Sequence, residues 1–220
     1  MLPEYFKCKK IVITAGPTYE KIDPVRFIGN YSTGKMGYAI AAALAENGAD
    51  VHLVSGPTRL EKPHAGISMY QVESAREMYD TCIRLFPDCN MAIMAAAVSD
   101  YRPATYNDTK IKKKDDRMIL ELVRNPDILA ELGKRKSERQ IVIGFALETD
   151  NELEHAKQKL EAKNADAIVL NSLNDKGAGF SHSTNKITII LKKGIIFEYP
   201  LKEKRDVAID IITCISENFN

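Results

Sequence analysis

The order of elements predicted between residues 11 and 57 constrains the fold of this 220-residue chain more than any other feature. The β-branched run at 11–15 predicts a buried strand, the alanine-rich stretch at 37–47 predicts a helix that ends at Gly48, and the run at 51–54 predicts a second strand. A strand, a glycine-containing loop, a helix and a strand make a βαβ unit, and such units build parallel sheets through right-handed crossovers. We therefore expect an α/β protein.

The alternation of strand and helix continues along most of the chain. Further strands are expected at 68–72, 91–98, 141–145 and 166–170. Helices are expected at 75–86 after a Ser74 N-cap, at 126–132 with Pro126 in the first helical position, and at 151–163. This order predicts a Rossmann-like, doubly wound and mostly parallel sheet.

Two regions depart from the alternation. Strands predicted at 186–191 and 195–199 flank Lys192-Lys193-Gly194, which is a hairpin signal, so we expect them to be antiparallel, with a closing helix at 207–215. The alternation lapses over a flap expected at about 101–123, because residues 101–114 are too polar and basic for a strand or a core helix, and loops of this length often act as flaps. Within this flap, residues 118–123 are expected to form one arm of an excursion. Residues 1–220 are expected to form a single domain.

The composition argues against several classes of protein. The formal net charge is only +1, so no global field attracts nucleic acid or a membrane surface. No stretch reaches the ~18 apolar residues of a membrane span, and the N-terminus has no long apolar run typical of a signal peptide. The four cysteines and four histidines show no metal-ligand spacing. We expect a cytoplasmic protein with reduced thiols, no nucleic-acid or membrane partner, and no metal site made by side chains.

The segment from Asp23 to Gly37 concentrates polar groups just ahead of a predicted helix. It holds the guanidinium of Arg26, the carboxamide of Asn30, hydroxyl groups and glycines. Free N–H groups and the positive end of the helix dipole at such a helix start suit a phosphate. The spacing matches neither a Walker A loop nor GxGxxG, so a simple glycine-bearing loop stays open as the alternative.

Further candidates follow from the rule that ligands bind beyond the carboxyl ends of parallel strands. Asp100 ends a buried strand, where a carboxylate is costly unless it is used. The lysine-rich run at 110–114 is either a solvated charge run or a flap that brings ammonium groups to a polyphosphate. Lys159 and Lys163 share a helix face, and they either bind phosphates or pair with Glu161 and solvent.

Eight motifs occur in order along the chain. They are ITAGPT at 13–18, DPVR at 23–26, NYSTGKMG at 30–37, VSGP at 54–57, AAVSDY at 96–101, KIKK at 110–113, NPDI at 125–128 and GFALET at 144–149. Together these motifs resemble the phosphopantothenate–cysteine ligase family, and the resemblance covers residues 10–215.

The resemblance implies an activity and partners. Members of the family join 4′-phosphopantothenate to L-cysteine in coenzyme A biosynthesis, and the bacterial branch uses CTP to form an acyl-cytidylate with release of pyrophosphate. It implies Mg²⁺ carried on the CTP phosphates, no flavin in this chain, and a homodimer with residues 118–123 and the C-terminal hairpin as candidate interfaces. It also implies that a flavin-dependent decarboxylase domain is fused to or associated with the ligase in longer members.

The resemblance also implies roles for individual residues. Asn30 would contact the acyl-cytidylate with Arg26 beside it, and Lys110 would come from the closing flap. The residues expected to bind the nucleotide are Gly16, Ser32, Gly34, Met94, Ala95, Ala96, Asp100, Lys110, Pro126, Asp127, Ile128, Leu129, Phe145, Lys159 and Lys163.

Two other classes of protein remain as alternatives. A nicotinamide-dependent oxidoreductase shares the βαβ start, but it usually has GxGxxG and an acid after the second strand, where this chain has Ser55-Gly56-Pro57. A non-catalytic nucleotide sensor or nucleic-acid module would use the run at 110–114 but has no use for Arg26 and Asn30. The preference for CTP over ATP rests on the resemblance alone.

Overall fold

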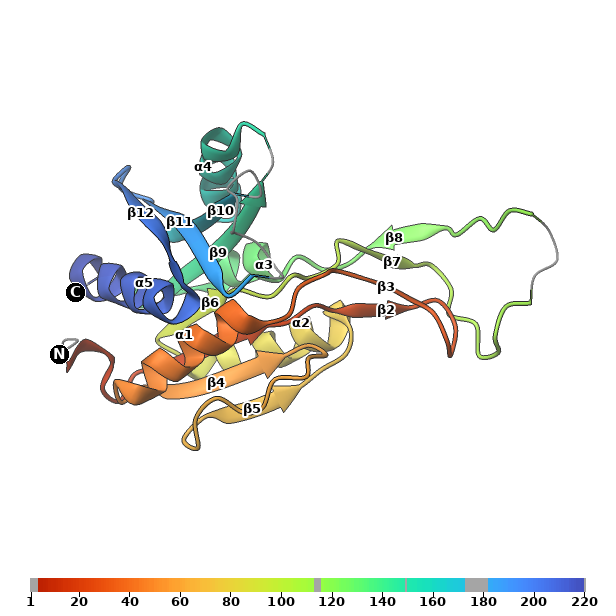
Figure 1. Ribbon diagram of the computed structural model, residues 1–220, viewed down its shortest axis with the longest axis horizontal. Helices are drawn as coiled ribbons and strands as arrows, with labels where there is room; N and C mark the ends of the chain where they lie inside the picture. The colour runs from red at the N-terminus through yellow and green to blue at the C-terminus, as the bar shows by residue number, and fades with distance from the viewer. Residues whose placement is uncertain (1–3, 113–115, 149, 173–181, 220) are drawn as a thin grey trace.

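A central sheet with helices on both faces forms the body of the protein (Figure 1). The computed structural model describes residues 4–112, 116–148, 150–172 and 182–219. Within these ranges the sheet has eight strands in the order β12-β11-β10-β9-β6-β1-β4-β5. The strands are β1 (Lys10–Ala15), β4 (Asp50–Ser55), β5 (Ser68–Gln71), β6 (Met91–Met94), β9 (Ile141–Glu148), β10 (Ala167–Ser172), β11 (Thr184–Leu191) and β12 (Ile196–Glu203).

The strand order is that of a Rossmann-like fold. β1 pairs in parallel with β4 on one side and with β6 on the other, and the parallel pairing continues outward to β5 and to β10. The order of connection therefore reverses between β1 and β6, where Thr14 lies opposite Met94. Ligands bind at such a switch point in open α/β sheets. β11 and β12 are antiparallel, which confirms the predicted sheet and hairpin.

Alternation along β1 explains the two helical layers. Ile11, Ile13 and Ala15 face the layer of α1 (Lys35–Glu46) and α5 (Lys204–Asn218). Val12 faces the opposite layer, which contains α2 (Ala75–Leu85), α3 (Ile128–Arg135) and α4 (Glu152–Ala162). Short 3₁₀ turns, η1 (Glu4–Phe6) and η2 (Phe86–Asp88), precede β1 and follow α2. No helix in the described ranges is long and apolar enough to cross a membrane.

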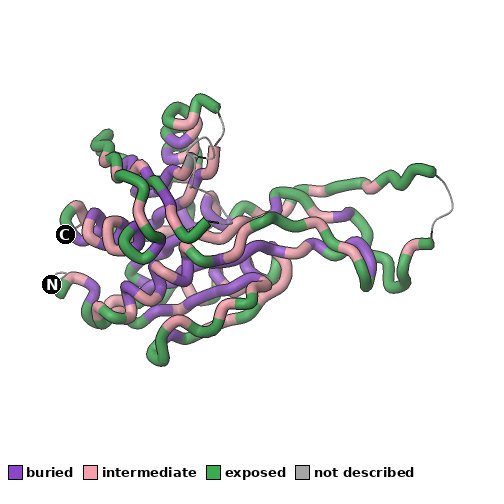
Figure 2. The backbone as a smooth tube through the Cα atoms, in the orientation of Figure 1, coloured by how far each residue is buried: buried purple, intermediate pink, exposed green. Residues whose placement is uncertain are grey.

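Two hairpins leave the body together as a long arm (Figure 1). One is β2 (Tyr19–Lys21) with β3 (Phe27–Gly29), and the other is β7 (Tyr101–Pro103) with β8 (Leu122–Arg124). The backbone N–H of Asn107 donates to the carbonyl of Ile22 at 3.1 Å, which joins the two hairpins. Most of the outer arm is exposed, whereas buried residues gather in the body (Figure 2). The excursion expected at 101–123 is present, but the first hairpin was not predicted.

The strand predicted at 91–98 ends early, at Met94. Beyond it the N–H of Ala96 donates to Thr14 Oγ1 at 3.2 Å, and the N–H of Ala97 donates to the carbonyl of Gly16 at 2.9 Å. The second bond belongs to an isolated parallel bridge between Pro17 and Ala97, whereas the continuous pairing with β1 ends at Met94. The small residues after β6 therefore form a loop at the switch point.

The start of α3 also differs from the prediction. Pro126 does not occupy the first helical position, because Asp127 is the N-cap and its Oδ1 accepts a 2.8 Å hydrogen bond from the N–H of Ala130. The side chain of an N-cap residue accepts a hydrogen bond from a free N–H of the first helical turn. A proline in the first position has no N–H and only reduces the number of free donors. α3 then continues to Arg135, three residues beyond the predicted end at Leu132.

Candidate active site

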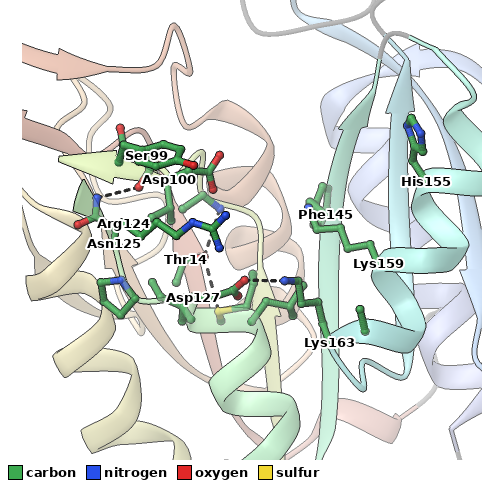
Figure 3. Close-up of a pocket in the computed structure, with 18 of the residues that line it drawn as sticks. Thr14, Ser99, Asp100, Arg124, Asn125, Asp127, Phe145, His155, Lys159 and Lys163 are labelled. Atoms are coloured by element: carbon green, nitrogen blue, oxygen red, sulfur yellow. Dashed lines mark hydrogen bonds and ion pairs between the residues drawn. The ribbon is translucent and has the colours of Figure 1, made fainter. Parts of the chain in front are cut away.

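A cavity of about 750 Å³ lies at the switch point (Figure 3). Its walls come from β1, the loop after β6, the root of the arm, the start of α3, β9 and one face of α4. The lining residues are Thr14, Met94, Ala96, Val98, Ser99, Asp100, Tyr101, Arg124, Asn125, Pro126, Asp127, Ile128, Leu129, Phe145, His155, Gln158, Lys159, Ala162 and Lys163. The volume and the mixture of apolar and charged groups suit a ligand of nucleotide size.

The loop after β6 is held by two threonines, Thr14 on β1 and Thr18 in the loop after β1. Thr14 Oγ1 accepts from the N–H of Ala96, and Thr18 Oγ1 accepts from the N–H of Ser99 at 3.0 Å. Both threonine side chains are buried, so these hydrogen bonds are protected from water. The loop is therefore a fixed wall of the cavity.

The root of the arm forms a second wall. Asn125 donates from Nδ2 to the carbonyl of Ser99 at 2.8 Å and from its N–H to the carbonyl of Asp100 at 2.8 Å. Arg102 donates to the carbonyl of Arg124 at 2.7 Å, which ties the two strands where they leave the body. The arm and the cavity therefore share residues.

Cations of α4 face the start of α3 across the cavity (Figure 3). Lys163 Nζ lies 2.7 Å from Asp127 Oδ2. Burial raises the pKa of Asp127, but hydrogen bonds from Lys163 and from the N–H of Ala130 outweigh it, so the pKa is lowered. Burial lowers the pKa of Lys159, and the nearby carboxylates of Glu148 and Asp127 only partly oppose this effect. An anionic ligand would relieve the cost of burying the Lys159 charge.

A second cavity of about 330 Å³ adjoins the first, and both are lined by Ala96, Val98, Asp100, Phe145 and Lys159. Its floor is the start of α1, where Gly34 is the N-cap residue with φ 78° and offers no side-chain cap. A Cβ at Gly34 would lie 3.2 Å from the backbone nitrogen of Gly16, so the position suits glycine sterically as well. The start of α1 therefore presents N–H groups without a side-chain cap to this cavity.

Polar side chains from distant strands close the second cavity. Asn185 is only 2% exposed and donates from Nδ2 to Asn171 Oδ1 at 2.9 Å. Its Oδ1 is buried and has no hydrogen-bond partner among the residues that the structure describes. Lys204, 8% exposed, lines the same cavity and donates to the carbonyl of His182 at 2.7 Å. A buried acceptor without a partner is costly, so this cavity suits a ligand that donates a hydrogen bond.

Most of the predicted site residues line these two cavities. Met94, Ala96, Asp100, Pro126, Asp127, Ile128, Leu129, Phe145, Lys159 and Lys163 line the larger cavity, and Asn30, Ser32, Gly34 and Ala95 line the smaller one. Asn30 donates from Nδ2 to the carbonyl of Ala97 at 2.8 Å, so the chain returning from the arm is fixed beside the loop after β6. Gly16 lies beneath Gly34 and lines neither cavity.

Arg26 and Lys110 are not brought to the cavities. Arg26 donates from Nη2 to the carbonyl of Ile111 at 2.8 Å and pairs with the buried carboxylate of Asp23. Lys110 is exposed on the arm next to Ile111, while Lys113 and Lys114 lie outside the described residues. Arg26 therefore does not line the smaller cavity with Asn30, because its guanidinium binds Asp23 and the carbonyl of Ile111 on the arm.

Several lining residues were not predicted. Thr14, Arg124, Asn125, His155 and Gln158 line the larger cavity, and Asn185 and Lys204 line the smaller one. Helical spacing offered a signal for His155, which precedes Lys159 by one turn of α4. Asn185 and Lys204 carried no comparable signal, because the antiparallel strand and α5 reach the site only through tertiary packing.

The described residues contain no group of three or more His, Cys, Asp or Glu side chains arranged to hold a metal ion. Of the carboxylates lining the larger cavity, Asp127 is already used by Lys163 and by the cap of α3. Asp100 is exposed where the two cavities meet. Any metal here would depend mainly on ligands brought by a substrate.

The strand order and the two cavities at the switch point define the class: a Rossmann-like α/β protein with its site at the carboxyl ends of the strands. The family described as the DNA/pantothenate metabolism flavoprotein C-terminal domain matches residues 6–219. The chain belongs to this family, which confirms the relationship that the motifs predicted.

Known relatives agree with this assignment. A protein of an unknown prokaryotic organism, named cysteine/cysteine sulfinic acid decarboxylase, is 52% identical over 204 residues, which cover 93% of this chain and 57% of that protein. The coenzyme A biosynthesis bifunctional protein CoaBC of Bacillus subtilis (strain 168) is 48% identical over 93% of this chain and 50% of that protein. The chain thus spans about half the length of these relatives.

A solved structure shares the whole fold. The crystal structure of the C-terminal domain of a coenzyme A biosynthesis bifunctional protein CoaBC is 43% identical, with a TM-score of 0.83. The match covers 98% of this chain and 97% of that chain.

Proposed function

We propose that this chain is a ligase that joins 4′-phosphopantothenate to L-cysteine, using CTP and an acyl-cytidylate intermediate, in coenzyme A biosynthesis. The observation that carries the proposal is the pair of adjoining cavities, which share Phe145 and Lys159 as common wall. Two substrates held side by side can react without leaving the protein, and such positioning supplies much of a ligase's rate enhancement.

The larger cavity takes the nucleotide. Met94, Ala96 and Leu129 supply apolar surface for a base and ribose, while Lys159 and Lys163 supply charge for the phosphates. The ion pair between Lys163 and Asp127 is partly exposed to solvent, so Lys163 can bind a phosphate either in place of Asp127 or in addition to it. Cations placed around a transferring phosphoryl group stabilise the charge that develops there.

The smaller cavity takes phosphopantothenate. The start of α1 offers backbone donors and a helix dipole to its phosphate, and Lys204 adds a nearby cation. The hydroxyl and amide groups in the middle of this substrate are hydrogen-bond donors, which suits the unpartnered Oδ1 of Asn185. The substrate carboxylate then points toward the wall that both cavities share.

The reaction proceeds in two steps, which are activation of the carboxylate and formation of the amide. A carboxylate oxygen of phosphopantothenate attacks the α-phosphorus of CTP, and pyrophosphate leaves with the electrons of the broken P–O bond. The cysteine amine then attacks the activated carbonyl carbon, loses a proton, and expels CMP with the former carboxylate oxygen. Asn30, fixed at the carbonyl of Ala97, has an amide suited to donate to the carbonyl oxygen as negative charge develops on it.

We also propose a homodimer, in which the arm contacts the second chain and carries Lys110 toward a cavity of that chain. Val25, Phe27, Met118 and Ile119 are apolar side chains of the arm that are between 50% and 94% exposed. Exposed apolar surface of this kind is typical of contact sites. Because Lys110 lies on the same arm, pairing of two chains offers a way for it to reach a cavity of the other copy. The C-terminal hairpin is the second candidate interface, because Ile195 in its turn and Leu201 on β12 are both exposed.

Mg²⁺ fits as an ion carried by CTP. Phosphate oxygens and water would hold it, with Asp100 available as a further oxygen ligand, and the ion would neutralise charge on the triphosphate. The thiols of Cys8, Cys82, Cys89 and Cys214 are all free, which supports a reducing cytoplasmic location. We also propose a flavin-dependent decarboxylase as fused or associated partner, because relatives of this chain carry the names decarboxylase and bifunctional protein.

The test is an assay of pyrophosphate and of the amide product with phosphopantothenate, cysteine and CTP, repeated with each substrate omitted. The proposal predicts pyrophosphate only when both CTP and phosphopantothenate are present, and amide product only with all three. ATP replaces CTP in a parallel series to test the choice of nucleotide. Pyrophosphate that forms without phosphopantothenate would contradict the proposal.

A further inference from the structure

His155 lies on the same face of α4 as the two lysines of the larger cavity. His155, Lys159 and Lys163 follow one another at intervals of four residues, and all three line the cavity (Figure 3). His155 comes first along the helix, so the three side chains form one row along the wall. A row of basic groups along a cavity matches the spaced charges of a polyphosphate.

The carboxylate of Glu148 lies beside the imidazole of His155. His155 Nδ1 lies 3.6 Å from Glu148 Oε2, and Glu148 is the last residue of β9. Glu148 does not line the cavity, whereas His155 does. This arrangement leaves the other ring nitrogen, Nε2, for a ligand.

We infer that His155, in its protonated form, is a third cationic ligand for the phosphates of the bound nucleotide and that Glu148 orients it. This inference rests on the proposed function, because it needs a nucleotide in the larger cavity. If His155 only formed a surface ion pair with Glu148, its replacement would have little effect on nucleotide binding.

Other charged groups also face this part of the cavity, and they set the background of the pH dependence. They are Asp100 after β6, Arg124 at the end of β8, Asp127 at the N-cap of α3, Lys159 on α4 and Lys163 at its C-cap, while Glu148 contacts His155 without lining the cavity. Histidine side chains in general change charge between about pH 5 and 8, where carboxylates, lysines and arginines keep theirs. The nucleotide titrates in the same range, so a variant with a permanent charge is needed as reference.

The experiment measures CTP binding to the full chain by calorimetry at about pH 6 and about pH 8.5. His155→Gln removes the charge and His155→Lys makes it permanent. His52→Gln is the matched control, because His52 also has a carboxylate neighbour, Asp50 at 3.7 Å, but lies on β4 outside both cavities. Melting temperatures of all variants identify any loss of fold.

The inference predicts that His155→Gln weakens CTP binding about five-fold at the lower pH and hardly at the higher pH. His155→Lys should bind CTP about five-fold more tightly than the wild type at the higher pH, while His52→Gln follows the wild type throughout. Equal binding by wild type and His155→Gln at the lower pH, or the same loss at both pH values, would overturn this inference alone. A wild-type chain that does not bind CTP would overturn the proposed function and this inference with it.

Discussion

The Arg26 guanidinium donates a 2.8 Å hydrogen bond from Nη2 to the backbone carbonyl of Ile111, which lies 85 residues further along the chain. The N–H of Ile111 in turn donates to Asp23 Oδ2 at 3.1 Å, so a single buried carboxylate and its arginine hold both hairpins of the arm together. Burial raises the pKa of Asp23, but hydrogen bonds from Arg26 and from the N–H groups of Val25 and Ile111 outweigh it and hold the pKa well below its usual range. Arg26 is thus a positioning residue for the segment that carries Lys110.

Arg26 and Lys110 should therefore act as one unit. We expect Lys110→Gln to lower kcat about 10²-fold with little change in melting temperature, because the arm contributes few buried contacts. Arg26→Gln should lower kcat by freeing the segment around Ile111, and it should speed amide hydrogen exchange there. The double variant should be no slower than Lys110→Gln alone.

The control for this cycle is Arg117→Gln, an exposed arginine of the same excursion. It should keep wild-type kcat and exchange rates. If the effects of Arg26→Gln and Lys110→Gln multiply in the double variant, the two residues act independently, and the positioning role is wrong.

Asn30→Ala should separate binding from chemistry. Asn30 is exposed and its side chain donates to the carbonyl of Ala97 in a loop, so we expect the fold and the Kd for CTP to stay near wild type. Loss of a donor to the developing oxyanion should lower kcat about 10²-fold or more. Kinetics and calorimetry on the same preparation measure both effects, and an unchanged kcat would leave Asn30 as a loop residue.

Lys159→Ala should raise the KM for CTP at least about ten-fold, because it removes a half-buried cation that faces the cavity and would bind the phosphates. Lys157→Ala is the matched control, since Lys157 is exposed on another face of α4 and lines neither cavity. Steady-state kinetics with varied CTP would measure the difference. Equal KM values for the two variants would argue against a nucleotide in the larger cavity.

The Asp127–Lys163 pair predicts a pH dependence of stability. The pKa of Asp127 is lowered in the folded chain from the unfolded value of about 3.9, so the folded state favours the ionised form. This stabilisation is present above about pH 4 and is lost as the pH falls through the lowered pKa of the folded state. Asp127→Asn keeps an N-cap side chain but removes the charge.

We therefore expect Asp127→Asn to melt below the wild type at neutral pH, with a gap that closes as the pH falls below about 4. Thermal unfolding across a pH series checks this expectation. A gap of constant size would mean that shape, and not charge, accounts for the role of Asp127.

The sequence predicted the body of the fold well because hydrophobic periodicity is local. The run at 11–15 and the helix after Gly34 follow directly from β-branched and alanine-rich patterns. The first hairpin was missed because Tyr19–Lys21 and Phe27–Gly29 are too short for a clear pattern and pair only within the arm. The end of β6 at Met94 depends on Thr14, a residue 80 positions away, which no local pattern can reveal.

The site was predictable where residues follow strands or share a helix face. Asp100, Phe145 and Lys159 fall into this group, and the structure brings them to one wall shared by both cavities. Asn185 and Lys204 were not predictable, since they come from an antiparallel strand and a helix that approach β10 and α1 only in the folded chain.

The most direct test of the central claim follows the substrate oxygen. Phosphopantothenate labelled with ¹⁸O in its carboxylate is turned over with CTP and cysteine, and the products are analysed by mass spectrometry. Attack of the carboxylate on the α-phosphorus predicts one labelled oxygen in the phosphate of CMP and none in pyrophosphate. Label in inorganic phosphate or pyrophosphate, with unlabelled CMP, would mean activation at another phosphorus and would contradict the acyl-cytidylate.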